Sequence, residues 1–333
     1  MSEGVLNLER FQFRNLHPKI LLGTASDRYA GWIGQIYTRE RYEGRITRRT
    51  NTVGGKSFVE ETLPVDSVAE YFEHFRVLEI DYTFYSPLVD AEGRPTQTHH
   101  VLRRYKDHMK EDDGMVLKVP QMISAQKLRR GGAYVQSETY LNAELFIRQF
   151  YEPAVEILQT GLSGMIFEQE YQRKQDRVPV KQMAEALDRF FEAVPKDPRY
   201  HIELRTDAYL AAPVFEVLER HGVGQVLSHW TWLPPLRKQL AKAEDRSLNS
   251  GRQRMVRLMT PIGMRYEDAY AKAHPFDKLV EGMLQPAMVR ETADLMRMAV
   301  RDGVETSILI NNRSGGNAPL IARKVVQEFL TVS

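Results

Sequence analysis

The stretch YHIELR, residues 200–205, alternates apolar and polar side chains in the way that a β-strand does. Successive side chains of a strand point in opposite directions, so Ile202 and Leu204 share one face. The opposite face carries His201, Glu203 and Arg205. In a barrel whose strands are covered by helices, the apolar face would meet the helices and the charged face would point inward. The rest of the chain decides whether such a barrel is present.

Seven further stretches are short and apolar in the same way, which gives eight candidate strands. Segments with helical periodicity alternate with them, for example residues 180–194 and 286–304. Strand followed by helix, repeated eight times, predicts an α/β fold of the (β/α)8 TIM-barrel type. An open, doubly wound sheet is the alternative, but it usually has fewer strands. The seven stretches are KILLGTA from Lys19, VLEIDYTFY from Val77, MVLKVP from Met115, GMIFEQE from Gly164, GQVLSHW from Gly224, RMVRLMT from Arg254 and TSILINN from Thr306.

The connections between these segments predict one barrel domain over residues 19–333, preceded by an N-terminal extension of residues 1–18. Helix-to-strand connections are mostly short. Three strand-to-helix connections are long, at residues 38–64, 121–140 and 261–285. They would lie at the carboxyl ends of the strands, where the active sites of TIM barrels are found, and long loops are usually functional. We therefore expect the functional site at that end.

The composition of the 333-residue chain narrows its functional class. A hydrophobic content of 42% supports a large core, and a net charge of +2 does not suggest a dedicated DNA-binding protein. The absence of cysteine excludes disulfides, thiolate catalysis and cysteine-ligated metal sites. The first residues lack the pattern of a signal peptide, and no apolar run is long enough to span a membrane. We expect a soluble, cytoplasmic protein without membrane contact.

Several charged residues fall on the predicted inward faces of the strands. Isolated buried charges are costly, so these residues must pair with one another or with a ligand. A purely structural lattice of ions is one interpretation. Because Asp81, Lys118 and Arg205 lie near the carboxyl ends of their strands, a functional site is the interpretation we favour. The inward set is Glu79, Asp81, Lys118, Glu203 and Arg205, with Glu168 on the strand next to that of Arg205.

The last strand runs into INNRSGGNAPL, residues 310–320, which predicts an anion site. Gly315 and Gly316 would let backbone N–H groups approach an anion, and Asn317 would cap a helix whose N-terminus favours negative charge. Arg313 would add a charge-assisted hydrogen bond. An ordinary tight turn followed by a capped helix is the alternative.

Basic residues in two of the long loops form a weaker signal. They could form a rim that attracts anions, or an ordinary solvated surface, since acidic residues such as Glu60 and Glu61 are mixed with them. His229 follows the sixth strand beside Trp230 and could line a pocket. The third, seventh and eighth strand ends offer no metal ligands, so we expect no metal and no cofactor. The basic residues are Arg39, Arg41, Arg45, Arg48, Arg49, Lys56, Lys127, Arg129 and Arg130.

With these motifs in place, the chain resembles domain-of-unknown-function family 72, also called the YecE-like proteins. The resemblance covers roughly residues 20–329 and implies a TIM barrel similar to sugar-isomerase and endonuclease IV type barrels, with no established reaction. Matching segments are YFEHFRVLEIDYTFY, LKVPQMIS, IELR and ILINNRSGGNAPLIAR, together with Gly23, Thr24, Trp32 and Tyr37 near the first strand.

The chain also departs from the pattern of that family. Met259 and Thr260 replace the usual His-Gly of the seventh strand, and Asp81 replaces an asparagine. The acidic residue expected late in the sixth strand is replaced around Ser228 and His229. These changes indicate a divergent member.

The leading hypothesis is an enzyme acting on a small polar, anionic or sugar-like substrate, as a metal-independent hydrolase, lyase or isomerase. Glu203 would act as acid or base, tuned by Arg205, while Lys118 would stabilise negative charge and Asp81 would orient Lys118 or the substrate. A nucleic-acid-binding or nucleic-acid-processing barrel, less favoured, and a non-catalytic ligand-binding barrel both remain open. The expected substrate-binding residues are Thr24, Trp32, Tyr85, Glu168, His229, Asn311, Asn312, Arg313, Gly315 and Gly316.

Overall fold

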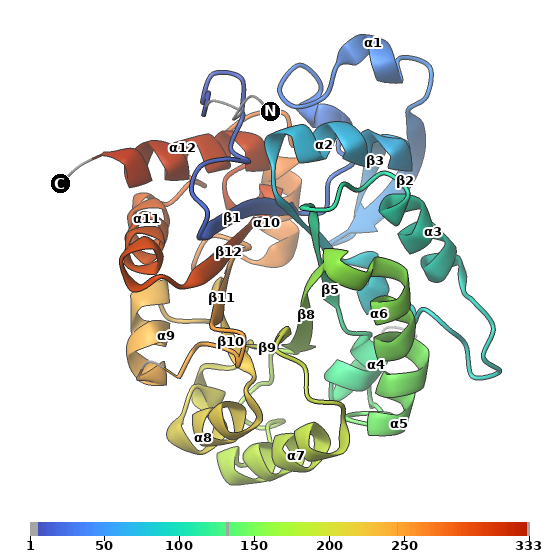
Figure 1. The fold of residues 1–333 in the computed structure, drawn as a ribbon, viewed down its shortest axis with the longest axis vertical. Helices are drawn as coiled ribbons and strands as arrows, with labels where there is room; N and C mark the ends of the chain where they lie inside the picture. Colours follow the sequence, from blue (N-terminus) through green and yellow to red (C-terminus); the bar gives the residue numbers. More distant parts are fainter. Residues whose placement is uncertain (1–5, 131–132, 245, 332–333) are drawn as a thin grey trace.

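A computed structural model describes residues 6–130, 133–244 and 246–331, and their centre is a closed barrel of eight parallel strands (Figure 1). The strands follow the ring in the order β1-β12-β11-β10-β9-β8-β5-β4, and β4 pairs with β1 to close it. All eight predicted strands and the TIM-barrel fold are confirmed. The strands are β1 (Ile20–Ala25), β4 (Val77–Ile80), β5 (Gly114–Lys118), β8 (Leu162–Gln169), β9 (Tyr200–Leu204), β10 (Gly224–His229), β11 (Gln253–Leu258) and β12 (Glu305–Ile310).

Helices surround this barrel on the outside, as Figure 1 shows. Their ends follow the signals in the sequence: Gly222 ends α8 in the left-handed conformation, with φ of 67°, and the Asn317 side chain caps α12 by accepting from the Leu320 N–H. The helices are α1 (Arg39–Tyr42), α2 (Val68–His74), α3 (Gln97–Lys106), α4 (Gln121–Ser124), α5 (Ala143–Phe146), α6 (Glu152–Leu158), α7 (Val180–Ala193), α8 (Ala212–His221), α9 (Leu236–Ala243), α10 (Tyr266–Ala273), α11 (Pro286–Asp302) and α12 (Ala318–Leu330).

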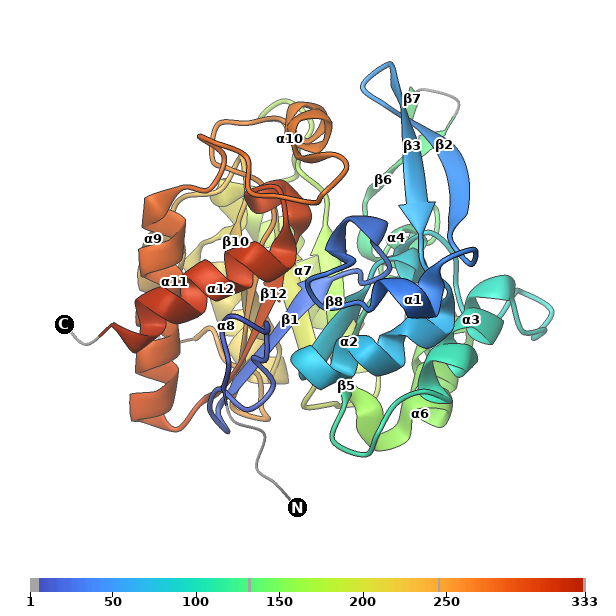
Figure 2. The ribbon, with the colours of Figure 1, turned by 90° about the horizontal axis from the view of Figure 1, so that it is seen from above.

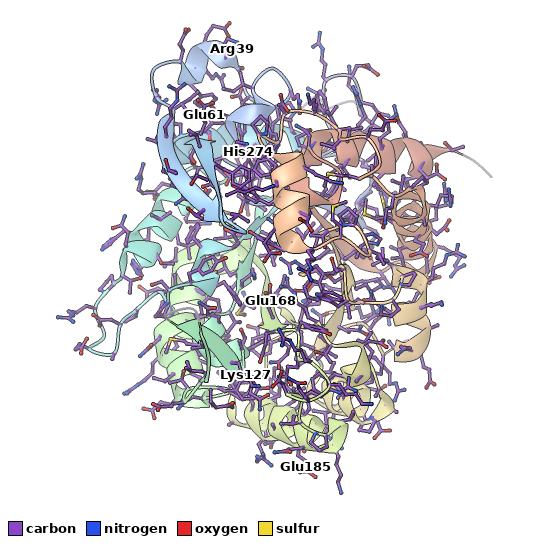
Figure 3. All side chains as sticks on the ribbon, turned by 180° about the vertical axis from the view of Figure 1, so that it is seen from behind. Arg39, Glu61, Lys127, Glu168, Glu185 and His274 are labelled. Atoms are coloured by element: carbon purple, nitrogen blue, oxygen red, sulfur yellow. The ribbon has the colours of Figure 1, made fainter. Side chains whose placement is uncertain are left out.

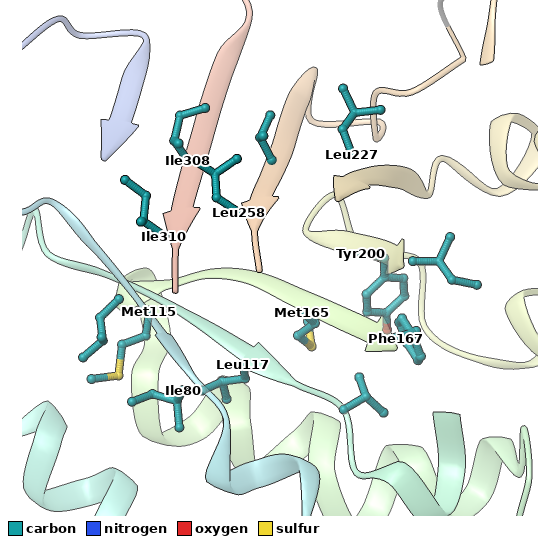
Figure 4. Close-up of a cluster of buried hydrophobic side chains, with 14 of the residues drawn as sticks. Ile80, Met115, Leu117, Met165, Phe167, Tyr200, Leu227, Leu258, Ile308 and Ile310 are labelled. Atoms are coloured by element: carbon teal, nitrogen blue, oxygen red, sulfur yellow. The ribbon is translucent and has the colours of Figure 1, made fainter. Parts of the chain in front are cut away.

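The main hydrophobic core lies between the strands and the helices. Outward-facing strand residues such as Leu117, Phe167 and Ile308 are fully buried there, and Figure 4 shows a cluster of them. This is the face that the alternation of residues 200–205 predicted for Ile202 and Leu204, both buried in the same core. Burial of this face stabilises the closed ring, which also leaves no free strand edge.

A second, smaller apolar cluster fills the inside of the barrel. On several strands a polar or charged residue follows the apolar one by two positions and therefore points inward directly above it. Glu79 follows Val77 in this way, and Arg257 follows Met255. The interior thus has an apolar floor and a charged layer nearer the carboxyl ends of the strands. The floor consists of Leu21, Val77, Val116, Ile166, Val226, Met255 and Leu309.

Two antiparallel hairpins and helix α10 project beyond the carboxyl ends of the strands (Figure 2). The hairpins pair β2 (Thr47–Val53) with β3 (Lys56–Thr62), and β6 (Lys127–Arg130) with β7 (Ala133–Gln136). The sequence predicted long, largely irregular loops here, because the mostly exposed β2 lacks the apolar run of a core strand. These segments surround the mouth of the barrel.

The segment that precedes β1 packs against the outside of the barrel. The Phe13 N–H donates to the carbonyl of His74 at 2.9 Å, and the Phe13 and Phe75 rings lie 5.4 Å apart. Arg14 forms an ion pair with Asp113 at 2.6 Å. The first five residues of the predicted N-terminal extension lie outside the described residues.

A candidate site at the mouth of the barrel

The lower part of the charged layer is centred on Arg257 of β11. Its Nε and Nη2 bind both oxygens of Glu79 at 2.8 and 2.5 Å, and its Nη1 lies 2.5 Å from Oε2 of Glu203. The Ser228 hydroxyl donates to the other oxygen of Glu203 at 2.6 Å. All four residues are at most 1% exposed, so this part of the layer is sealed from solvent.

The upper part consists of Lys118, Glu168 and Arg205, and it reaches closer to the mouth. Lys118 Nζ lies 2.5 Å from Oε2 of Glu168, and Arg205 Nη1 lies 2.7 Å from Oε1 of the same carboxylate. Aromatic rings cover both cations: Lys118 Nζ lies 3.9 Å from the centre of the Phe84 ring, and the Arg205 guanidinium lies 5.0 Å from that of Trp230. Figure 3 labels Glu168 near the middle of the barrel.

The two parts are joined and their charges balance. Arg205 Nε lies 3.1 Å from Glu203, and Arg257 Nη1 lies 3.4 Å from Glu168. Three carboxylates, those of Glu79, Glu168 and Glu203, face three cations. Burial alone would raise the pKa of Glu168, but the charges of Arg205, Lys118 and Arg257 outweigh it and hold that pKa well below its usual range. Glu168 therefore stays ionised and cannot serve as a proton donor near neutral pH.

Glu203 and Arg205 point inward, as the sequence predicted. Their contacts, however, do not fit the catalytic roles predicted for them. Glu203 is fully buried, and its two oxygens are bonded to Ser228, Arg205 and Arg257, so it has no access to a ligand at the mouth. Lys118 pairs with Glu168 rather than with Asp81, so of the two roles predicted for Asp81, orienting Lys118 or orienting the substrate, this contact does not support the first. The carboxylate of the layer that approaches the mouth is thus Glu168, and Glu203 holds Arg205 in position.

Asp81 lies just past the end of β4 and is half-buried. Within the described residues its carboxylate forms no hydrogen bond or salt bridge, in contrast to the acidic residues of the layer below. Burial and the charge of Asp81 raise the pKa of the Tyr29 phenol, whereas the Arg313 guanidinium lowers it, so both charges act on one tyrosine. Asp81 and Arg313 therefore belong to the same region of the mouth, together with Tyr85, which is exposed.

Four of the predicted site residues take part in other contacts. The Thr24 hydroxyl donates to the Ser26 carbonyl at 2.7 Å and lies 3.0 Å from the Tyr71 hydroxyl. The Trp32 indole donates to Asn312 Oδ1 at 3.1 Å, which ties the loop after β1 to the loop after β12. His229 bonds Gln285 Oε1 through Nε2 at 2.9 Å, and burial lowers its pKa to about 4. All four are buried, and the contacts that we see are within the protein.

The turn after β12 corrects the predicted anion site. Its N–H groups are already used: Gly315 and Gly316 donate to the Asn312 carbonyl, Ala318 donates to Asn312 Oδ1, and Arg313 donates to Asn311 Oδ1. Gly316 has φ of 112°, and a Cβ there would lie 2.3 Å from the carbonyl oxygen of Lys278. The two glycines are therefore explained by close packing and a tight turn, the alternative interpretation of this motif. The Arg313 guanidinium of this turn stacks on the Tyr266 ring of α10, 4.5 Å from its centre.

Arg257 is the central residue that the sequence interpretation missed. It shares a strand face with Met255, two residues away, and that alternation marks it as inward-facing. A second signal was available, because the carboxylates predicted inside the barrel outnumbered the predicted cations. Asp27 was also missed. It follows β1, is 2% exposed and accepts a hydrogen bond from Tyr105 at 2.9 Å, while burial raises its pKa to about 6.

The described part of the chain offers neither a cluster of metal ligands nor a helix that could cross a membrane. No group of three or more His, Asp or Glu side chains there could hold a metal ion. None of the helices that the structure describes is both long and apolar enough to cross a bilayer. The side chains of Arg129 and Arg130, which the sequence placed in a basic loop, lie outside the described part.

The closed ring of eight parallel strands makes this a TIM-barrel protein, with its charged groups at the mouth of the barrel. A family model described as "Protein of unknown function DUF72" matches residues 48–331, so the chain belongs to the DUF72 family. A DUF72 family protein from Enterococcus faecalis superposes with a TM-score of 0.54 at 14% identity, covering 94% of this chain and 96% of that one. One from Thermotoga maritima gives 0.52 at 16%, covering 93% and 97%. These likenesses show the fold alone. A comparison with curated proteins found no match.

Proposed function

We propose that this protein is an enzyme that acts on a small polar substrate at the mouth of the barrel, with Asp81 as the acid or base. One observation carries the proposal: Asp81 is half-buried above a charge-balanced layer, and its own carboxylate has no ion-pair partner among the described residues. A carboxylate held at a strand end without a structural partner is available to a substrate.

The neighbouring groups have complementary roles in this proposal. Arg313 binds an anionic or electron-rich substrate oxygen, because its guanidinium stacks on Tyr266 at 4.5 Å and forms no salt bridge within the described residues. Lys118 and Arg205, fixed by Glu168, provide a preorganised positive surface that stabilises negative charge in the transition state. Glu203 and Arg257 are positioning residues beneath them.

These groups support a class of reaction. A carboxylate acting as acid or base, next to fixed cations, supports proton abstraction or hydrolysis. Such an arrangement suits a metal-independent isomerase, lyase or hydrolase.

Turnover by the full-length protein tests the proposal. The chain is incubated with panels of lactones, esters, sugars and sugar phosphates, and products are followed by mass spectrometry. Once a substrate is found, Asp81→Asn is expected to lower kcat by about 100-fold or more, the usual contribution of a general acid or base. The Tm should change little, because Asp81 makes no ion pair with the described residues. Glu61→Gln, on the exposed hairpin, is the matched control and should keep full activity.

Two outcomes would contradict the proposal. One is turnover that Asp81→Asn leaves unchanged. The other is a ligand that binds at the mouth and is never converted, which would make the protein a non-catalytic binding barrel. A small-molecule ligand recovered from the purified protein would identify the substrate class directly.

A further inference from the structure

The exposed aromatic side chains gather at one end of the molecule. Among the described residues, seven large hydrophobic side chains are exposed, and four of them are aromatic. Every one of these four lies in a segment that follows a barrel strand: Tyr85 after β4, Tyr171 after β8, Trp232 after β10 and Tyr266 in α10 after β11. All four therefore belong to the carboxyl-terminal end of the barrel, where the proposed active site lies.

One pair of these rings stands over the Arg205 side of the mouth. Tyr171 and Trp232 are stacked, with ring centres 5.3 Å apart and planes within 24° of each other, and they are 42% and 47% exposed. Trp230 adjoins this pair, 6.2 Å from Tyr171, and covers the Arg205 guanidinium. Since β9 lies between β8 and β10, Arg205 comes from the strand between those that carry the two rings.

A second group lies on the arc of strands from β11 through β12 and β1 to β4. Tyr266 stacks against the Arg313 guanidinium, and Tyr85 is 71% exposed. The charges of Asp81 and Arg313 act on Tyr85 as well as on Tyr29. Both groups thus place a flat apolar surface next to a charged hydrogen-bonding side chain.

Covering such rings with a ligand removes their apolar faces from water, which is favourable. Their exposure in the free protein therefore indicates a partner with flat apolar faces. A sugar ring has an apolar C–H face and an edge of hydroxyls that both donate and accept hydrogen bonds. The mouth offers both kinds of partner, guanidinium donors on Arg205 and Arg313 and a carboxylate acceptor on Asp81. Tyr171 and Trp232 follow β8 and β10, whereas Tyr266 and Tyr85 follow β11 and β4, so the exposed rings are distributed around the mouth. A protein partner would be expected to need one continuous apolar patch instead.

Single-stranded nucleic acid also stacks its bases on aromatic rings, but it requires a positive groove for the phosphates. Here the arginines of the adjoining hairpin are paired with carboxylates. Arg48 pairs with Glu61 at 2.7 Å, and Arg49 pairs with Glu60 at 2.9 Å. Arg45 pairs with Asp66 at 2.8 Å. Among the described residues the mouth then keeps one unpaired carboxylate, Asp81, and one guanidinium without a salt bridge, Arg313. This near-neutral balance favours an uncharged chain.

We infer that the mouth binds a neutral carbohydrate chain, one part of it stacked on Tyr171 and Trp232 and another part on Tyr85 and Tyr266. The chain crosses the mouth above Lys118, Glu168 and Arg205. This inference names the substrate class and rests on the proposed function for the position of the reacting group.

Tryptophan fluorescence of the full-length protein tests the inference. The chain has three tryptophans; Trp32 is fully buried, and the other two, Trp230 and Trp232, lie at the mouth. The probes are cello-, xylo-, malto- and chito-oligosaccharides. At least one series is expected to shift the emission and to protect it from quenching by iodide, with longer chains binding more tightly. Titration calorimetry then gives the affinity.

Two variants locate the binding surface. Trp232→Ala and Tyr266→Ala should each weaken the affinity for that oligosaccharide by about tenfold, the loss expected for one aromatic contact. Leu330→Ala is the matched control, because Leu330 is 46% exposed but lies at the end of α12, and it should bind as the unmodified protein does.

The inference is overturned if no oligosaccharide alters the fluorescence, or if both aromatic variants bind as tightly as the unmodified protein. Tight binding of single-stranded DNA or RNA that depends on Trp232 would also overturn it. Failure of the proposed function looks different. If an oligosaccharide binds through these rings but is never converted, the result supports the carbohydrate site and contradicts the proposed enzyme activity. If turnover depends on Asp81 but is unchanged in both aromatic variants, the result supports the enzyme activity and contradicts the carbohydrate site.

Discussion

Arg257 and Glu79 face each other across the inside of the barrel through two parallel hydrogen bonds, 2.8 and 2.5 Å long. Their strands, β11 and β4, are not neighbours, since β12 and β1 lie between them in the ring. The pair therefore spans the barrel, and the further bond from Arg257 to Glu203 extends the connection to β9. Guanidinium and carboxylate match best in this bidentate geometry, which a lysine cannot reproduce.

Removal of this guanidinium should destabilise the protein severely. Arg257→Met leaves Glu79 and Glu203 buried without their main cation, and such a loss costs about 3–5 kcal/mol. Arg257→Lys keeps the charge but loses the paired hydrogen bonds, so its free energy of unfolding should lie between that of the parent and that of Arg257→Met. Urea unfolding measures the difference. Arg48→Met, which breaks an exposed pair on the β2–β3 hairpin, should cost less than about 1 kcal/mol. Equal losses for Arg257→Met and Arg48→Met would refute the central role of Arg257.

Asp27 should make stability fall as the pH rises. Burial raises its pKa from the ordinary value of 3.8 to about 6. A carboxyl with a raised folded-state pKa stabilises the fold fully below 3.8, and this contribution is lost as the pH rises through 6. One oxygen of Asp27 has no hydrogen-bond partner among the described residues, which adds to the cost of ionisation.

Asp27→Asn removes that ionisation, so the variant should gain stability relative to the parent as the pH rises from 3.8 to about 6, by about 3 kcal/mol at most. Melting temperatures across this range measure the effect. Asp107→Asn, at an exposed position at the end of α3, should follow the parent at every pH. A stability difference between Asp27→Asn and the parent that does not vary with pH would rule out the titration of Asp27.

Gly316 should matter for folding rather than for ligand binding. A Cβ at this position would lie 2.3 Å from a backbone carbonyl, and φ is 112°, so Gly316→Ala combines a steric clash with backbone strain. Gly282 also has a positive φ, of 75°, but open space around it. Gly282→Ala should therefore cost only about 1 kcal/mol, and Gly316→Ala clearly more. Similar costs for the two variants in denaturant unfolding would show that the packing around Gly316 adjusts.

Nucleic acid should bind weakly. The arginines of the β2–β3 hairpin are paired with carboxylates, which leaves few free cations for phosphates. The affinity for single- and double-stranded DNA and RNA, measured at low and at physiological salt, should be in the range typical of non-specific binding. Tight binding with a steep salt dependence, abolished in Arg48→Gln and Arg49→Gln, would instead favour the nucleic-acid alternative.

The strands and the inward direction of their charges could be predicted from the sequence because a period of two is a local property of the chain. The alternation of Glu203 with Ile202 and Leu204 is enough to place Glu203 inside the barrel. The helix caps at Gly222 and Asn317 are local signals of the same kind. The order of the short motifs likewise predicts the family, which the family model confirms.

The ion-pair partners of the inward-facing charges could not be predicted from the sequence, because they depend on how far each strand is shifted along the barrel. Lys118 lies on the strand next to that of Asp81, yet it bonds Glu168 on its other side. The glycines after β12 look like an anion loop in sequence, but the segment at residues 278–280 fills the space beside them. The exposed aromatic residues are scattered along the chain, and only the closure of the barrel brings them to one end.

The charge-balanced layer also has a consequence for how the barrel assembles. Glu79, Lys118, Glu168, Glu203 and Arg257 come from five different strands, and each meets its partners only if its strand carries it inward. A slip of one residue in any of these strands would turn its charge outward into the apolar layer beneath the helices. Misaligned barrels would thus bear an unpaired ion in a hydrophobic environment, and the layer selects the correct strand alignment among the many that apolar strands alone would tolerate.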